Sequence, residues 1–285
     1  MTTNHRTCVR AIAASVLFGM PVAPAWAQSG TTATQTVDAM NQLWGRHPET
    51  RANHAKGVVV EGSFTPTPEA ATLSKASLFE GRPVPLTLRF SDSTGLPTIP
   101  DGAEDANPHG LSLKFHLADG GEMDGVSNSL AFFPVATGEE FRDLLQALAA
   151  SGPDAAKPTK AEQFIAAHPS VPKAFASATT PTSYARETYK LPQRLAKQPI
   201  AFHAMAQLAD PGDQTKDPTQ PWPADRRMVD LGTITITKAV PDSAAAEKAL
   251  LLLPNRLPSG IEASDDPLIG ARVQAYLISV GRRTR

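Results

Sequence analysis

The alternation of apolar and polar residues constrains the fold of this chain more than any other feature. Residues 84–91 read VPLTLRFS, so that every second residue is apolar. Because successive side chains of a strand point to opposite faces, such a segment buries one face and leaves the other polar. Strands are expected at 57–64, 84–91, 111–117, 130–135, 200–205 and 229–239. Six strands with long loops rich in Pro and Gly predict an antiparallel sheet or barrel.

Segments with helical spacing flank these strands, at residues 33–46, 137–150, 160–167 and 267–280. Thr137 followed by Glu140 predicts a capping box at the start of the second of these helices. Two acids and a proline at 265–267 favour the start of the last helix. The predicted fold class is therefore α+β, with an antiparallel β-barrel core and flanking helices. No repeat and no long linker divides it, so we expect one domain over residues 28–285.

The first 27 residues have the pattern of an export signal. Arg6 and Arg10 precede an apolar run over residues 11–22, and Ala-Trp-Ala at 25–27 has the small-x-small form of a cleavage site. A run of about 12 apolar residues is too short for a membrane span, which needs roughly 20. We expect a signal peptide at 1–27 and a periplasmic location in a Gram-negative-type cell. An apolar N-terminus that simply frays is the alternative.

Charge and cysteine content exclude several kinds of protein. The chain has 27 basic and 28 acidic residues, so it lacks the basic excess that binding of nucleic acid requires. Removal of the signal leaves a net charge of −3 and also removes Cys8, the single cysteine. The exported chain would then have no disulfide and no thiolate, and a metal would be held by His, carboxylate, Tyr or Met. No other apolar run reaches the length of a membrane span.

Three small groups of residues could carry chemistry. His54 comes just before the first strand, Arg89 and Ser91 share the polar face of the second, and Arg272 and Tyr276 are four apart on the last helix. Taken singly, each has an ordinary structural interpretation: a core histidine, a solvated sheet face and a packing pair. A guanidinium held against a phenol nevertheless favours the phenolate, and a phenolate can ligate ferric iron.

In their order and spacing these groups resemble the haem catalase superfamily, and within it the short branch of catalase-related peroxidases. The matching motifs are Arg-x-x-His-Ala-Lys-Gly at 51–57, Arg-Phe-Ser at 89–91 and Arg-x-x-x-Tyr at 272–276. Further agreement comes from STGLP at 93–97, NSLAFFPV at 128–135, PWP at 221–223 and LPSGIEASDDPL at 257–268. The resemblance runs from about residue 35 to the C-terminus.

The resemblance implies a haem b cofactor between the barrel and the last helix. His54 corresponds to the distal histidine that moves the peroxide proton, and Ser91 would fix its tautomer. Tyr276 would be the axial ligand of the haem iron, with Arg272 as its charge partner. Three further arginines resemble those that bind the haem propionates, since guanidinium groups suit carboxylates: Arg51, Arg89 and Arg283.

Two positions depart from the pattern of the large catalases. Asn128 corresponds to their distal asparagine when the stretch to the phenylalanines at 132–133 is taken as one residue shorter. Asn53 stands where they have a valine beside the distal histidine, which implies a more polar pocket. The chain is also far shorter than a full catalase, and no NADPH site is expected.

The function implied by the resemblance is that of a haem peroxidase, an oxidoreductase that acts on peroxide. It would reduce hydrogen or organic peroxides with a small organic electron donor and have weak or no catalase activity. One alternative is a haem-dependent isomerase or dehydratase of fatty-acid hydroperoxides. Another is a non-enzymatic exported barrel that binds haem or another apolar ligand. Association with a second copy of the chain is left open.

Overall fold

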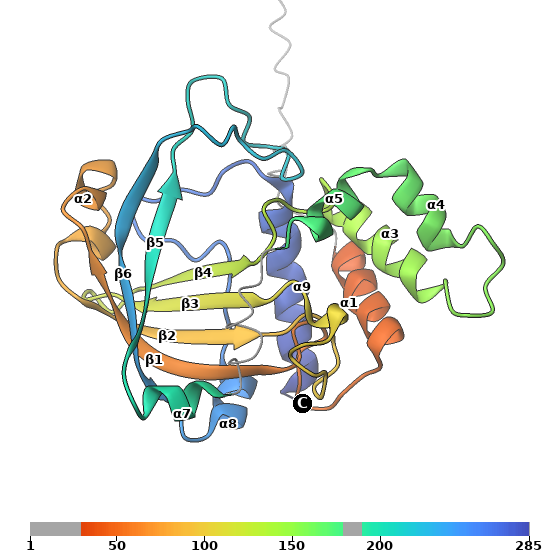
Figure 1. Ribbon diagram of the computed structural model, residues 1–285, viewed down its shortest axis with the longest axis horizontal. Helices are drawn as coiled ribbons and strands as arrows, with labels where there is room; N and C mark the ends of the chain where they lie inside the picture. The colour runs from red at the N-terminus through yellow and green to blue at the C-terminus, as the bar shows by residue number, and fades with distance from the viewer. Residues whose placement is uncertain (1–29, 179–189, 285) are drawn as a thin grey trace, which may run out of the picture.

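The computed structural model describes residues 30–178 and 190–284; the predicted signal peptide at 1–27, with Cys8, lies outside the described residues. A curled antiparallel sheet forms one side of the molecule and a group of helices the other (Figure 1). The long C-terminal helix α9 (Pro267–Arg283) runs between them, beside α1 (Gly30–Trp44) and α3 (Gly138–Ala149). The predicted α+β fold class is confirmed, with the sheet curled into a half-barrel.

The sheet contains six strands in the order β4-β3-β2-β1-β6-β5, and every neighbouring pair is antiparallel. The strands are β1 (Gly57–Pro66), β2 (Val84–Ser91), β3 (Gly110–His116), β4 (Glu122–Asn128), β5 (Ile200–Gln207) and β6 (Met228–Ala239). Five of them match the strands expected from alternation to within two residues at each end. Alternation of apolar and polar residues therefore predicts the position of a strand correctly where one face of that strand is buried.

The strand predicted at residues 130–135 is wrong: that segment is a loop, and the fourth strand is Glu122–Asn128. Gly120 adopts a positive φ of 83° in a tight turn after β3, so the chain pairs with β3 at once. As an edge strand β4 buries few of its side chains and shows no apolar alternation. Phe133 and Val135 of this segment instead pack against Phe141 and Leu144 of α3, and the backbone N–H of Phe133 donates to Pro218 O.

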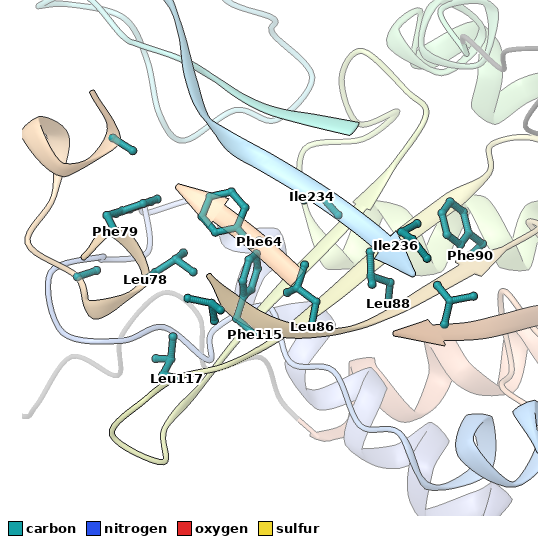
Figure 2. Close-up of a cluster of buried hydrophobic side chains, with 14 of the residues drawn as sticks. Phe64, Leu78, Phe79, Leu86, Leu88, Phe90, Phe115, Leu117, Ile234 and Ile236 are labelled. Atoms are coloured by element: carbon teal, nitrogen blue, oxygen red, sulfur yellow. The ribbon is translucent and has the colours of Figure 1, made fainter. Parts of the chain in front are cut away.

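The main hydrophobic core fills the inside of the half-barrel (Figure 2). Leu86, Leu88 and Phe90 of β2 are at most 2% exposed, and Phe64 of β1 packs edge-on against Phe115 of β3 at 5.6 Å between ring centroids. Truncating such a phenylalanine to alanine typically costs roughly 3–5 kcal/mol of stability. The second half of the other face of β2 is also buried, where Arg89 is 3% and Ser91 is 2% exposed. Its polar side chains therefore line an interior site rather than a solvated surface.

The four predicted helices are confirmed as α1, α3, α4 (Lys160–Ala167) and α9. The predicted capping box on α3 is half right: Thr137 accepts from Glu140 N, whereas the Glu140 carboxylate accepts from Ala136 N. Helical spacing does not predict the short helical segments, because one or two turns are too few to show a repeat. These segments are α2 (Ala70–Leu73), α5 (Ser170–Ala176), α7 (Leu191–Leu195), α8 (Ser243–Ala249), η1 (Ser77–Phe79) and η2 (Glu104–Ala106). None of the helices in the described ranges has the length and apolarity needed to cross a membrane.

Candidate active site

A cavity of about 750 Å³ lies between the sheet and helices α1, α3 and α9. Its volume falls in the range typical of small-molecule and cofactor sites, roughly 300–1,000 Å³. The wall includes all of the predicted site residues: Arg51, His54, Arg89, Ser91, Asn128, Arg272, Tyr276 and Arg283. Segments more than 200 positions apart in the sequence thus meet at one site. Apolar side chains, among them Phe133, Phe141 and Leu144, complete the wall.

His54 is held by its backbone in an unusual conformation. Its φ is +53°, in the left-handed region that non-glycine residues rarely adopt. Hydrogen bonds fix this turn from both sides. The backbone N–H of His54 donates to Asn53 Oδ1 at 2.9 Å, and the Arg89 guanidinium donates to His54 O at 2.7 Å. Residues held in such a conformation occur preferentially at functional sites, and here the turn carries the imidazole to the cavity wall.

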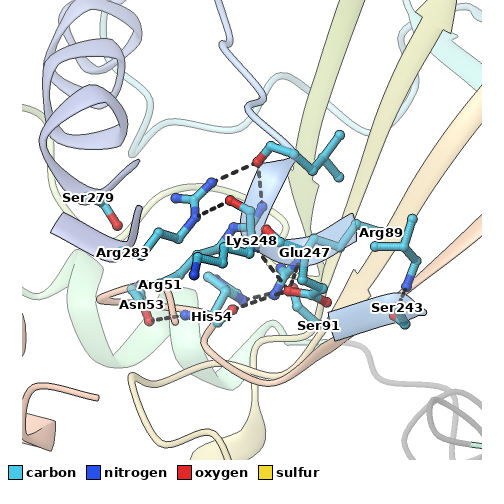
Figure 3. Close-up of polar contacts among 12 residues, drawn as sticks. Arg51, Asn53, His54, Arg89, Ser91, Ser243, Glu247, Lys248, Ser279 and Arg283 are labelled. Carbon is cyan, nitrogen blue, oxygen red and sulfur yellow. Dashed lines mark hydrogen bonds and ion pairs between the residues drawn. The ribbon is translucent and has the colours of Figure 1, made fainter. Parts of the chain in front are cut away.

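The imidazole of His54 is neutral at ordinary pH. Burial, followed by the positive charge of Arg89, lowers its pKa from 6.5 to about 3. Its Nδ1 lies 3.2 Å from Ser91 Oγ, which belongs to the polar face of β2 (Figure 3). Gly110 provides room for this pair, because a Cβ there would come within 2.5 Å of Ser91 Oγ and 3.2 Å of His54 Nδ1. The arrangement presents a fixed, uncharged imidazole that can accept a proton.

Asn128 ends β4 and pairs in register with Gly110, and it lines the cavity that His54 also lines. Its side-chain oxygen accepts a hydrogen bond from Leu130 N at 3.0 Å, and the residue is exposed. Asn53 also lines the cavity, and its side-chain oxygen is engaged by the backbone of His54. Both amides therefore serve local backbone turns.

On the α9 side of the cavity, a guanidinium is held against a phenol. Arg272 donates to the Tyr276 hydroxyl at 3.0 Å, and its Cζ lies 5.6 Å from the ring centroid. The helix begins at a proline, with Asp266 as N-cap accepting from Leu268 N. Residues four apart then lie on one face of the helix. One turn after Tyr276, the Ser279 hydroxyl accepts from Ala52 N at 3.3 Å and ties α9 to the turn that carries His54.

Arg51, Arg89 and Arg283 gather at one end of the cavity, on the loop after α1, on β2 and on α9. Arg51 and Arg283 both donate to Leu250 O at 2.8 Å. Burial and the charge of neighbouring arginines lower the pKa of Arg51 well below its usual value and that of Arg283 to about 10. Positive charge is therefore in excess at this end of the cavity.

Sequence reasoning missed Glu247, which binds two of these arginines. Its Oε2 lies 3.0 Å from Arg51 and 2.8 Å from Arg89. The residue occurs in the stretch SAAAEKA of α8, where Glu next to Lys suggests a solvated helix surface. No local pattern could have found it, since its partners are 196 and 158 positions away.

The side chains present fit a haem. A phenol with a basic partner suits the iron, the apolar wall suits a porphyrin ring, and three guanidinium groups at one end suit its two carboxylates. The imidazole of His54, from the turn before β1, lines the same cavity as the phenol.

Comparison with known proteins places the chain in a family. Residues 28–190 match the family model described as Catalase. A catalase-related peroxidase of Synechococcus elongatus is 30% identical and covers 91% of each chain, and one of Mycolicibacterium paratuberculosis is 30% identical over 90% of this chain and 96% of that protein. A fungal catalase shares the fold at a TM-score of 0.69 and 18% identity over 84% of this chain, which spans 59% of that catalase. The chain therefore belongs to the catalase family.

Proposed function

We propose that this chain is a haem peroxidase that reduces hydrogen peroxide or an organic hydroperoxide with a small organic electron donor. The observation that carries the proposal is that a neutral His54, bonded to Ser91, and the Arg272–Tyr276 pair line one cavity. The names of the two relatives at 30% identity support peroxide as the substrate class.

Haem b is the cofactor that we propose. Tyr276 would hold the iron through its phenolate oxygen, and the adjacent guanidinium of Arg272 would offset that negative charge. Arg51, Arg89 and Arg283 would take the two propionates. When bound, haem supplies the redox-active iron at which the O–O bond of a peroxide is broken.

His54 is the group that moves the proton. Because burial and Arg89 lower its pKa to about 3, the imidazole is neutral and its free ring nitrogen can take a proton from one peroxide oxygen; the same low pKa favours release of that proton. It then delivers that proton to the second oxygen, which leaves as water or as an alcohol. Ser91 keeps the ring in place through Nδ1, so that the same nitrogen serves both transfers. The donor supplies two electrons in single steps, and with two protons from the donor or from solvent these reduce the first oxygen to water.

We also propose that disproportionation of hydrogen peroxide is weak. Large catalases carry an asparagine in the distal pocket, and the resemblance aligns Asn128 with it. Here the side-chain oxygen of Asn128 accepts a hydrogen bond from Leu130 N, and the residue is exposed.

Export to the periplasm through residues 1–27, leaving one domain at 28–285, is likewise our proposal. It rests on the basic, apolar and Ala-Trp-Ala pattern of that segment.

The test is turnover by the protein purified with haem. Consumption of hydrogen peroxide and of cumene hydroperoxide is measured with and without a phenolic donor, together with release of oxygen. Donor-dependent consumption with little oxygen is the expected result. Rapid oxygen release would identify a true catalase, and consumption of a fatty-acid hydroperoxide without donor would identify a hydroperoxide isomerase or dehydratase. No turnover of any peroxide would leave a haem-binding protein and refute the proposal.

A further inference from the structure

Glu247 stands behind the cavity wall rather than in it. The residue belongs to α8, which packs against β1, and it does not line the cavity, whereas its partners Arg51 and Arg89 do. Figure 3 shows its side chain among the arginines, at the point where α8, β2 and the loop before β1 meet. Its side chain is 13% exposed. A carboxylate in this position acts on the cavity through the arginines that it binds.

The carboxylate is bonded through one oxygen. Oε2 accepts from Arg51 and from Nε of Arg89, whereas Oε1 is buried and has no hydrogen-bond partner. Space for the carboxylate comes from β1, because a Cβ at Gly57 would collide with Glu247 Oε1 and with the Arg89 guanidinium. A buried carboxylate oxygen without a partner costs free energy. That cost is offset when the carboxylate neutralises buried positive charge.

The charges at this end of the cavity do not balance. Three guanidinium groups face one carboxylate, which leaves a net charge of +2. In the described ranges, Arg51 and Arg89 form their ion pairs with Glu247, and Arg283 donates to the backbone carbonyls of Lys248 and Leu250. Burial is the main cause of the lowered pKa values of Arg51 and Arg283, and the positive charge of Arg89 lowers both further. Two further negative charges at this end would balance the cluster.

We infer that Glu247 is a positioning residue that holds Arg51 and Arg89 at the cavity wall and sets the charge of the arginine cluster to +2, which matches a ligand with two carboxylates. This inference rests on the proposed haem, whose two propionates bring a charge of −2. Glu247 has a second effect, since it lowers the repulsion among the three arginines before the ligand binds. It therefore stabilises the ligand-free chain while moderating the attraction for the dicarboxylate.

The experiment uses the full chain prepared without haem and two iron-free probes, protoporphyrin IX and its dimethyl ester, which lacks both carboxylate charges. Binding is followed by porphyrin fluorescence, and the midpoint of thermal unfolding, Tm, is measured without ligand. The variant is Glu247→Gln, which keeps the shape and one acceptor oxygen and removes the charge. The matched control is Glu49→Gln, which removes the exposed partner of Lys248, the residue next to Glu247, and changes the net charge equally.

We expect Glu247→Gln to lower the Tm of the ligand-free chain by roughly 5–10 °C, as the loss of a buried ion-pair partner does. Its preference for the diacid over the ester should rise roughly tenfold, because the cluster then carries a charge of +3. Glu49→Gln should leave both quantities within error of the unmodified chain. An unchanged or reduced preference in Glu247→Gln would overturn the inference.

Two further outcomes are decisive. If Glu247→Gln is insoluble alone, refolding with protoporphyrin IX should restore soluble protein and refolding with the ester should not; equal failure with both would overturn the inference. If the unmodified chain binds neither porphyrin, the proposed cofactor is wrong, and Glu247 then has no dicarboxylate to match. Binding by the unmodified chain with identical behaviour of the two variants refutes the role of Glu247 alone.

Discussion

The hydroxyl oxygen of Ser91 lies 3.2 Å from Nδ1 of His54, although the two residues are 37 positions apart. The pairing of β1 with β2 sets this distance, because Gly57, at the start of β1, stands opposite Ser91. The orientation of the imidazole therefore depends on the sheet, which places Ser91, as well as on the turn that carries His54. Changes to the sheet near this pair should alter peroxide chemistry even where they do not touch the ligand.

Replacement of His54 by alanine should keep haem and remove the acid–base step. General acid–base catalysis contributes typically ~10²–10⁴-fold, so the rate of reaction with peroxide in stopped-flow absorbance should fall within that range. His203→Ala is the control, because His203 is an exposed residue of β5 outside the cavity. A His54→Ala rate equal to that of the control would remove His54 from the mechanism.

A methyl group at Gly110, on the neighbouring strand β3, should disturb the contact between Ser91 and His54. Its Cβ would come within 2.5 Å of Ser91 Oγ and 3.2 Å of His54 Nδ1, so the imidazole has to move. Gly110→Ala should slow the reaction with peroxide at least tenfold and lower stability by about 1–3 kcal/mol. Gly125→Ala on β4 is the matched control, since a Cβ there meets the Leu113 side chain at an ordinary 3.5 Å. Equal rates for the two variants would contradict this assignment.

Tyr276→Phe should abolish most retention of haem, because a phenyl ring has no oxygen to offer to the iron. The measurements are haem stoichiometry after purification and the charge-transfer bands of the ferric protein. Retention of full haem with an unaltered spectrum would show that the iron has another ligand.

Arg272→Ala should give an intermediate result: part of the haem is kept, and the charge-transfer bands shift. The guanidinium lies 3.0 Å from the Tyr276 hydroxyl, and its loss leaves the phenolate without a positive partner. Arg282→Ala on the same helix is the control, because Arg282 pairs with Asp38. Haem content and bands identical to those of the control would separate Arg272 from the iron site.

The low pKa of His54 should make stability depend on pH. In the unfolded chain His54 takes up a proton below about pH 6.5, whereas in the folded chain it does so near pH 3. Stability from this residue is therefore fully present above pH 6.5 and is lost as the pH falls towards 3. Between pH 7 and pH 5 the loss amounts to about 2 kcal/mol.

Urea unfolding of the haem-free chain at the two pH values measures this loss. His54→Gln should remove it, so that the difference between the unmodified chain and the variant isolates the contribution of His54. An equal loss in both proteins would mean that the folded-state pKa of His54 is not lowered.

The sequence by itself determined the elements whose pattern is local. Alternation located five strands, and helical spacing located α1, α3, α4 and α9, because each of these segments buries a regular set of its own side chains. The edge strand β4 was missed for the same reason, since it buries little and its register comes from the turn at Gly120. The site residues were found through a resemblance, because single histidines, arginines and tyrosines carry no periodic signal.

Tertiary structure alone decided the electrostatic character of the site. The sequence shows Arg89 and Ser91 on the polar face of a strand, which is usually solvated, and the helices packed over that face bury both residues. Burial next to Arg89 lowers the pKa of His54, and contacts across 196 and 158 positions join Glu247 to two arginines. Charge interactions depend on distance in space and on access of water. Both the distances and the access of water are set by the folded structure. The pKa of His54 and the contacts of Glu247 could therefore not be predicted from residues adjacent in the sequence.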